Sequence, residues 1–264
     1  MRDGLEAAAA VDLLPANDAK GQGNMGGLGI KALTFDTGGT ILDWHTGFRN
    51  ALTAAGARHG LSHDWSDFTN ELRRRSLKRM LRLGEHAPPA YNFDQAHRAV
   101  LDELLAERGL DALTDADRHA IAYDAPHGFT CWPDFPAMLP RLRQRFICAS
   151  FTILSLRMIV DTARANGLSW DAVISCEAIG KYKILPESYR IAARLLQLDP
   201  SECCMVACHN FDLDAAMAEG FRTAFVRRPA EWGAAGPPDP EPNPHHDIVV
   251  DSFPDLLEAL AARG

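Results

Sequence analysis

Short apolar runs alternate with helical patterns along the second half of the chain, and this alternation constrains the fold more than any other feature. The runs cover residues 146–151, 172–176, 203–208, 223–226 and 247–250, and segments of helical spacing lie between most of them. Strands joined by helices pair in parallel, because a parallel neighbour needs a crossover connection. The sequence therefore predicts an α/β fold, with a Rossmann-like core and a mostly parallel sheet.

One more apolar run, residues 30–35, lies far upstream, and the chain between it and residue 130 has apolar residues at mostly helical spacing. We expect this stretch to form a helical domain that is inserted into the α/β core. The predicted boundaries are 30–48 and 130–258 for the core, 49–129 for the helical cap, and 1–29 for a mobile extension whose end is rich in Gly and Asn.

The composition excludes several classes of protein. Hydrophobic residues make up 47 % of the 264 residues and charged residues 23 %, as in ordinary globular chains. The net charge of −8 predicts no nucleic acid partner and no attraction to a membrane surface. The apolar N-terminal stretch is cut by Asp12 and Pro15, which is not typical of a signal peptide. We therefore expect a cytoplasmic protein whose six cysteines are reduced.

Polar side chains follow the predicted strands at the edge where a parallel sheet binds ligands. In chain order they are Asp36 and Thr40 at the two ends of a Gly-rich turn, then Thr152, Lys183 and Asp212. A carboxylate at such a position can serve as a metal ligand, a general base or a nucleophile. Structural alternatives exist as well, because Asp36 could cap its turn and Asp212 could pair with Arg222.

The turn Asp36-Thr37-Gly38-Gly39-Thr40, with the later Thr, Lys and Asp, resembles the four motifs of the haloacid dehalogenase superfamily, whose members use the first Asp as a nucleophile. Phosphatases of the superfamily have a second Asp where this chain has Gly38, and an acidic Mg²⁺ ligand where it has Cys208. Glycine transfers no proton, and a thiol is a poor ligand for a hard cation. The chain is therefore most similar to the L-2-haloacid dehalogenase (type II) branch, from about residue 30 to the last strand.

This resemblance implies a set of site residues and a reaction. The implied catalytic residues are Asp36, Thr40, Thr152, Lys183 and Asp212, and the implied substrate-binding residues are Arg73, Tyr189, His209 and Phe211. Asp36 attacks C2 of a small 2-haloalkanoic acid and displaces halide, and water then hydrolyses the aspartyl ester to a 2-hydroxy acid. The implied ligands are the 2-haloacid and the halide. No cofactor and no metal is implied, and relatives are often homodimers.

Three positions depart from the pattern of this branch. Gly38 replaces a residue that is usually aromatic, Ile153 replaces Asn, and Ile184 replaces Pro. Two other functions therefore stay open, namely a metal-dependent phosphatase of the same superfamily and a non-catalytic binding protein on this fold.

Some of the implied site residues also have ordinary alternatives. Arg73 belongs to a basic helical run that could be a solvated face, and the implied position could be shifted by one turn. His209 and Phe211 could simply pack at the end of the sheet, with the imidazole hydrogen-bonded rather than reactive.

Overall fold

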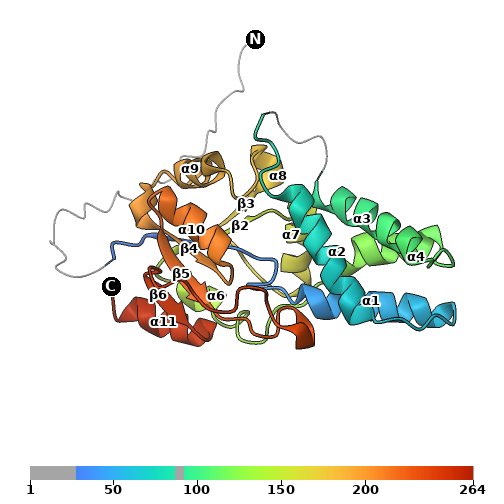
Figure 1. Ribbon diagram of the computed structural model, residues 1–264. Coiled ribbons are helices and arrows are strands. Elements are labelled where there is room, and N and C mark those ends of the chain that lie inside the picture. Colours follow the sequence, from blue (N-terminus) through green and yellow to red (C-terminus); the bar gives the residue numbers. More distant parts are fainter. Residues whose placement is uncertain (1–27, 87–91, 264) are drawn as a thin grey trace, which may run out of the picture.

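The computed structural model describes residues 28–86 and 92–263, so most of the predicted 1–29 extension lies outside the described residues. Within them, six strands form one sheet in the order β3-β2-β1-β4-β5-β6 (Figure 1). The strands are β1 (Ala32–Phe35), β2 (Ile147–Thr152), β3 (Ala172–Ser175), β4 (Cys203–Ala207), β5 (Arg222–Val226) and β6 (Ile248–Val250). Every neighbouring pair is parallel, which confirms the predicted α/β fold.

The strand order reverses at β1, and this reversal locates the site. β1 pairs with β2 on one side and with β4 on the other, so that Phe35 is in register with both Ser150 and Val206. The chain adds β3 beyond β2 in one direction, and β5 and β6 beyond β4 in the other. Ligands bind at such a reversal, beyond the carboxyl ends of the strands. Asp36, the first residue past β1, lies at this point.

The sheet is buried because its strands are almost wholly apolar and are covered on both faces. All four residues of β1 are fully buried, and the Phe35 ring packs against Phe135 and Phe253 at centroid distances of 5.7 and 6.2 Å. All six cysteines are free, as predicted, and five of them are buried. Each strand is thus held in the core while its carboxyl end remains available for polar side chains.

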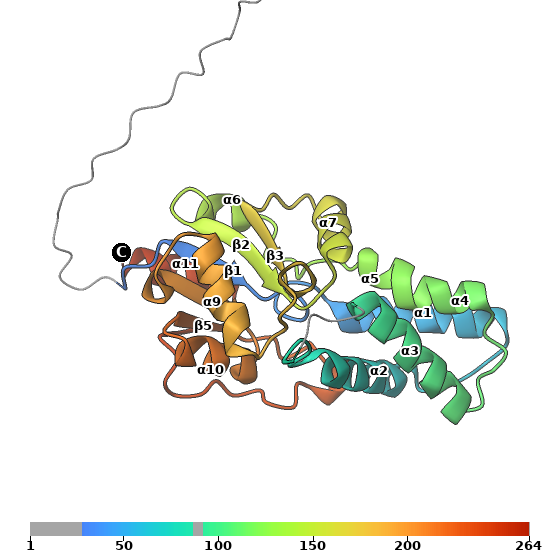
Figure 2. The ribbon, with the colours of Figure 1, turned by 90° about the horizontal axis from the view of Figure 1, so that it is seen from above.

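Helices cover both faces of the sheet (Figures 1 and 2). α9 (Pro186–Leu195) and α10 (Asn210–Ala218) lie on one face, and α6 (Leu139–Leu142), α7 (Leu156–Ala165) and α11 (Phe253–Ala261) lie on the other. The short helix α8 (Cys176–Ile179) follows β3. None of the helices in the described part of the chain is long and apolar enough to cross a membrane.

The segment between β1 and β2 is helical, in the region predicted as the cap. It contains α1 (Trp44–Arg58), α2 (Trp65–Met80), α3 (Phe93–Glu107), α4 (Asp115–His119), a π-helical turn at 120–124 and α5 (Ala125–His127), which lie together beside the sheet (Figure 2). Side chains that accept backbone hydrogen bonds fix where the long helices begin, with Asp43 capping α1, Asp64 capping α2, and Asn92 and Gln95 forming a capping box on α3. The exact domain boundaries stay a prediction.

One histidine is part of the apolar interior of these helices. His97 of α3 is 1 % exposed, and its ring packs against Phe48 and Phe93 at centroid distances of 5.0 and 4.2 Å. Neither ring nitrogen has a hydrogen-bond partner. Burial, together with the nearby charge of Arg73, lowers the pKa of His97 to about 3. The folded protein therefore holds this imidazole in its neutral form.

We expect the His97→Phe variant to lose less stability than wild type in mild acid. The folded-state pKa of His97 lies below the unfolded value of about 6.5, so the unfolded chain binds the proton first and stability falls as the pH drops below about 6.5. Between about pH 7.5 and 5, wild type should lose roughly 2 kcal/mol more unfolding free energy than the variant, as measured by urea denaturation. Equal losses in the two proteins would show that the folded state accepts this proton.

Candidate active site

The Asp36 carboxylate lies at the centre of a buried polar cluster. Asp36 is 6 % exposed; Thr40 Oγ1 donates to its Oδ2 at 2.8 Å, and Lys183 Nζ donates to its Oδ1 at 3.2 Å. The backbone N–H of Cys208 donates to Thr40 Oγ1 at 3.0 Å, so the hydroxyl hydrogen of Thr40 is directed to Asp36. Both carboxylate oxygens are therefore held by donors.

These contacts keep Asp36 ionised. Burial by itself would raise the pKa of this carboxyl, but the charge of Lys183 and the hydrogen bonds of His209 and Thr40 outweigh burial and hold the pKa well below its usual range. An ionised carboxylate that is shielded from bulk water is a stronger nucleophile than a solvated one. Asp36 is thus suited to attack carbon.

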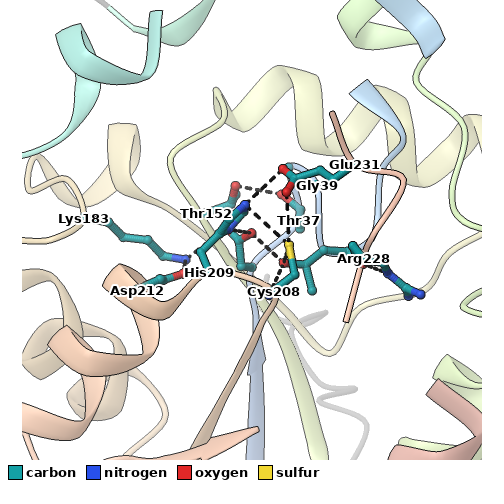
Figure 3. Close-up of polar contacts among 12 residues, drawn as sticks. Thr37, Gly39, Thr152, Lys183, Cys208, His209, Asp212, Arg228 and Glu231 are labelled. Carbon is teal, nitrogen blue, oxygen red and sulfur yellow. Dashed lines mark hydrogen bonds and ion pairs between the residues drawn. The ribbon is translucent and has the colours of Figure 1, made fainter. Parts of the chain in front are cut away.

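Lys183, Asp212 and Tyr189 form a chain of contacts beside Asp36. Lys183 Nζ lies 2.6 Å from Asp212 Oδ2, and the Tyr189 hydroxyl donates to Asp212 Oδ1 at 2.6 Å. All three side chains are almost fully buried, and Figure 3 shows Lys183 and Asp212 meeting at the carboxyl end of the sheet. Burial and the like charge of Asp36 raise the pKa of Asp212, which makes it a better proton acceptor than an ordinary carboxylate.

Thr152 lies close to the nucleophile but does not hold it. Its Oγ1 accepts hydrogen bonds from Thr37 Oγ1 at 2.7 Å and from the backbone of Leu154 at 3.2 Å. The resemblance implies that Thr152 is catalytic, which would place its hydroxyl on the Asp36 carboxylate. In this structure that contact is made by Thr40, and Thr152 instead fixes the turn that follows Asp36.

Arg73 points inward from α2, unlike the arginines that follow it. It is 4 % exposed, and its Nη2 donates to the Gly38 carbonyl at 3.0 Å, while its Nε has no hydrogen-bond partner. Arg74 and Arg75 instead pair with Glu71 at the surface. The solvated-face alternative therefore applies to these two neighbours and not to Arg73.

Because Gly38 and Gly39 have no side chains, the charged groups of Arg73 and Glu231 can pack directly against the turn. A Cβ on Gly38 would lie 3.2 Å from Arg73 Nη2, and a Cβ on Gly39 would lie 2.0 Å from Glu231 Oε1. Gly39 also has φ +102°, which disfavours any other residue. The aromatic wall that Gly38 cannot supply comes from Trp44 and Phe93, whose ring centroids lie 5.2 and 5.7 Å from the Arg73 guanidinium carbon.

His209 faces the nucleophile, whereas Phe211 packs against the His209 ring. His209 Nδ1 lies 3.4 Å from Asp36 Oδ2, and the imidazole stacks on Phe211 at a centroid distance of 5.2 Å. Burial opposes a charged imidazole, but the Cys208 sulfur and the carboxylates of Glu231 and Asp36 raise the pKa of His209 well above its usual range. His209 therefore joins the polar cluster, and packing is the observed role of Phe211.

Glu231 is a site residue that the sequence argument missed. It is 1 % exposed; its Oε1 accepts from Trp44 Nε1 at 2.8 Å and lies 3.0 Å from His209 Nε2. Arg228 holds the Glu231 segment in place, since Arg228 Nε donates to the Thr40 carbonyl at 2.9 Å. Its position in the sequence could have indicated it, because Glu231 comes five residues after the last residue of β5 and so reaches the same edge of the sheet as Asp36.

The charges around Asp36 do not suit a Mg²⁺ ion. Such a cation prefers oxygen ligands, and the carboxylates here are those of Asp36, Asp212 and Glu231. Lys183 already pairs with Asp36 and Asp212, His209 lies between Asp36 and Glu231, and Arg73 donates to the Gly38 carbonyl. Cys208 adds a thiol whose pKa burial raises to about 11, and a thiol is a soft, weak ligand for Mg²⁺.

A parallel α/β sheet with an ionised Asp at the tip of its central strand, paired with a buried Lys, defines a class of hydrolases. The family model of haloacid dehalogenase-like hydrolases matches residues 30–216. The chain belongs to this family. Glu231 lies beyond the matched residues.

Several characterised relatives are similar over most of the chain. The (S)-2-haloacid dehalogenase 1 of Pseudomonas sp. (strain CBS-3) is 31 % identical, over 88 % of this chain and 98 % of the relative. The crystal structures of the L-2-haloacid dehalogenase PA0810 and of the defluorinating L-2-haloacid dehalogenase Rha0230 are each 33 % identical with a TM-score of 0.80. They cover 88 % of this chain, and the matches span 99 % and 95 % of those chains.

We expect Arg73→Ala to weaken the binding of small carboxylates such as propionate, because a charged hydrogen bond contributes about 1.5–3 kcal/mol, or roughly 10- to 150-fold in affinity. Arg74→Ala is the matched control, since its side chain is 62 % exposed and should change the affinity little. Calorimetric titration of both variants measures the difference. A larger loss in Arg74→Ala would place the carboxylate on the other face of α2.

Proposed function

We propose that this protein hydrolyses small 2-haloalkanoic acids, namely L-2-haloacids and haloacetates, to 2-hydroxy acids through an ester on Asp36. The observation that carries the proposal is the ionised, buried Asp36 carboxylate, which is held by Thr40 and Lys183 and lies near enough to the Arg73 guanidinium for the two charges to interact. The names of the most similar relatives support the same substrate class.

The first step joins Asp36 to the substrate. Arg73, whose Nε has no hydrogen-bond partner, binds the substrate carboxylate and so presents C2 to the nucleophile. An Asp36 oxygen attacks C2 from the side opposite the halogen, and the halide leaves with the bonding electron pair. This displacement inverts C2 and needs no proton donor, which accounts for the glycine at position 38.

The second step hydrolyses the ester. Asp212 takes a proton from a water molecule that attacks the Asp36 carboxyl carbon, and Tyr189 and Lys183 hold Asp212 in place. The bond from this carbon to the substrate oxygen breaks, the departing alkoxide receives the proton, and Asp36 ionises again as the second water proton is released.

The two alternatives fit the geometry less well. A phosphatase needs a group that protonates the leaving alcohol, and Gly38 carries none. A binding protein would not need the ionised contact between Lys183 and Asp36, which remains in place despite Ile153 and Ile184. The cytoplasmic location and the homodimer stay predictions.

Halide release separates these functions. The protein should release chloride from chloroacetate and from L-2-chloropropionate, with EDTA present, and should show no comparable activity on p-nitrophenyl phosphate. Asp36→Asn should abolish release, because a neutral amide is a much poorer nucleophile than a carboxylate. Mg²⁺-dependent phosphate release would support the phosphatase, and binding without turnover would support the non-catalytic protein.

Isotope labelling tests the ester itself. In a single turnover in ¹⁸O-water with enzyme in excess, the oxygen delivered to C2 comes from Asp36, so the hydroxy acid should be unlabelled and the peptide that contains Asp36 should gain the label. Mass spectrometry of both products measures this. Labelled hydroxy acid with an unlabelled peptide would make Asp36 a general base that activates water.

A further inference from the structure

We propose that His209, as an imidazolium held by Glu231, stabilises the oxyanion that forms on Asp36 when water attacks the ester. The proposal rests on the proposed ester mechanism and deepens it, because it assigns the second step to residues beyond Asp212. His209 is the catalytic residue of the pair, and Glu231 is its positioning residue.

The contacts of the imidazole define its charge. Nδ1 lies 3.4 Å from Asp36 Oδ2. Nε2 faces Glu231 Oε1 at 3.0 Å (Figure 3). An ionised carboxylate only accepts hydrogen bonds, whereas a neutral imidazole carries a single N–H. Carboxylates on both sides of the ring favour the imidazolium, which carries an N–H on each nitrogen. Burial opposes a charged ring, but Glu231 and Asp36 both raise the pKa of His209.

The surroundings of Glu231 favour its ionised form beside this ring. Its pKa is lowered because His209, Arg73 and the Trp44 hydrogen bond outweigh the effect of burial. Cys208 Sγ also lies near, 3.4 Å from His209 Nε2, but burial raises the pKa of this thiol to about 11 and leaves it neutral near pH 7. The charged groups in contact with His209 are thus the two carboxylates.

The two oxygens of Asp36 are unequal, and this difference assigns their roles. Within the described part of the chain, Oδ2 is in contact with Thr40 at 2.8 Å and His209 at 3.4 Å, whereas Oδ1 is in contact with Lys183 alone at 3.2 Å. An oxygen whose lone pairs are engaged by two donors is the poorer nucleophile. Oδ1 therefore bonds to C2, and Oδ2 becomes the carbonyl oxygen of the ester.

Negative charge then develops on Oδ2 when water attacks the ester carbon. Thr40 donates to this atom and His209 Nδ1 lies 3.4 Å from it, so both groups are placed to stabilise the charge as an oxyanion hole does. The ester no longer carries the Asp36 charge, so Glu231 alone keeps His209 protonated. Collapse of the intermediate restores the C=O bond, and the bond from the carboxyl carbon to Oδ1 breaks. The electron pair goes to the alkoxide, which receives the proton taken up by Asp212, and His209 keeps its own proton throughout.

Measuring halide release and ester hydrolysis separately tests the roles proposed for His209 and Glu231. In Glu231→Gln, the initial burst of halide should stay within about 2-fold of wild type, while hydrolysis in a single turnover should slow roughly 10- to 100-fold and the Asp36 ester should accumulate. Glu241→Gln is the matched control, because it is an exposed glutamate in the same segment, and it should match wild type in both steps.

The pH dependence distinguishes positioning from loss of structure. Removing the Glu231 charge lowers the pKa of His209, so hydrolysis by Glu231→Gln should fall as the pH rises, while wild type stays flat over the same range. In ¹⁵N NMR, His209 should remain an imidazolium at a higher pH in wild type than in the variant. This readout needs no substrate.

A second variant keeps the test decisive if Glu231→Gln folds poorly. His209→Asn should slow hydrolysis to a rate independent of pH, and the double variant should be no slower than His209→Asn alone. Equal slowing of halide release and hydrolysis in Glu231→Gln would overturn the roles proposed for His209 and Glu231. A neutral His209 in wild type near pH 7 would overturn them as well. Failure of wild type to release any halide would instead overturn the proposed function.

Discussion

Lys183 holds two buried carboxylates together, and the rest of the site depends on this contact. Its ammonium lies 3.2 Å from Asp36 and 2.6 Å from Asp212, and all three side chains are nearly inaccessible to solvent. Without the ammonium, two like charges would be buried side by side, at a cost of several kcal/mol. The same ion pairs keep Asp36 ionised for attack on carbon and place Asp212 where it can take a proton from water.

The acidic side chains of the site are matched by basic ones. Three carboxylates, those of Asp36, Asp212 and Glu231, lie among three cationic side chains, those of Lys183, Arg73 and His209. In the proposed mechanism a substrate carboxylate binds beside Arg73 as a fourth negative charge, and the first step removes one charge from Asp36. The arrangement thus favours a reaction that converts a buried carboxylate into a neutral ester.

The paired glycines of the turn decide which side chains reach Asp36. Gly38 leaves room for the Arg73 guanidinium from α2, and Gly39 leaves room for the Glu231 carboxylate from the segment after β5. A larger residue at either position would move one of these charges away. Position 38 carries no aromatic side chain, and the aromatic rings next to the Arg73 guanidinium are those of Trp44 and Phe93.

The sequence by itself determined the parallel sheet, because alternation of apolar runs and helices is a local property. It also indicated Asp36, Thr40, Lys183 and Asp212 as candidates, because each lies in a segment that follows a predicted strand. Arg73 was chosen from its basic run by resemblance, and only packing showed that it points inward. The contact partners of Glu231 and of Thr152 were decided by the tertiary structure alone. Their contacts join segments far apart in the chain, and no local pattern specifies which side chain meets which across the end of a folded sheet.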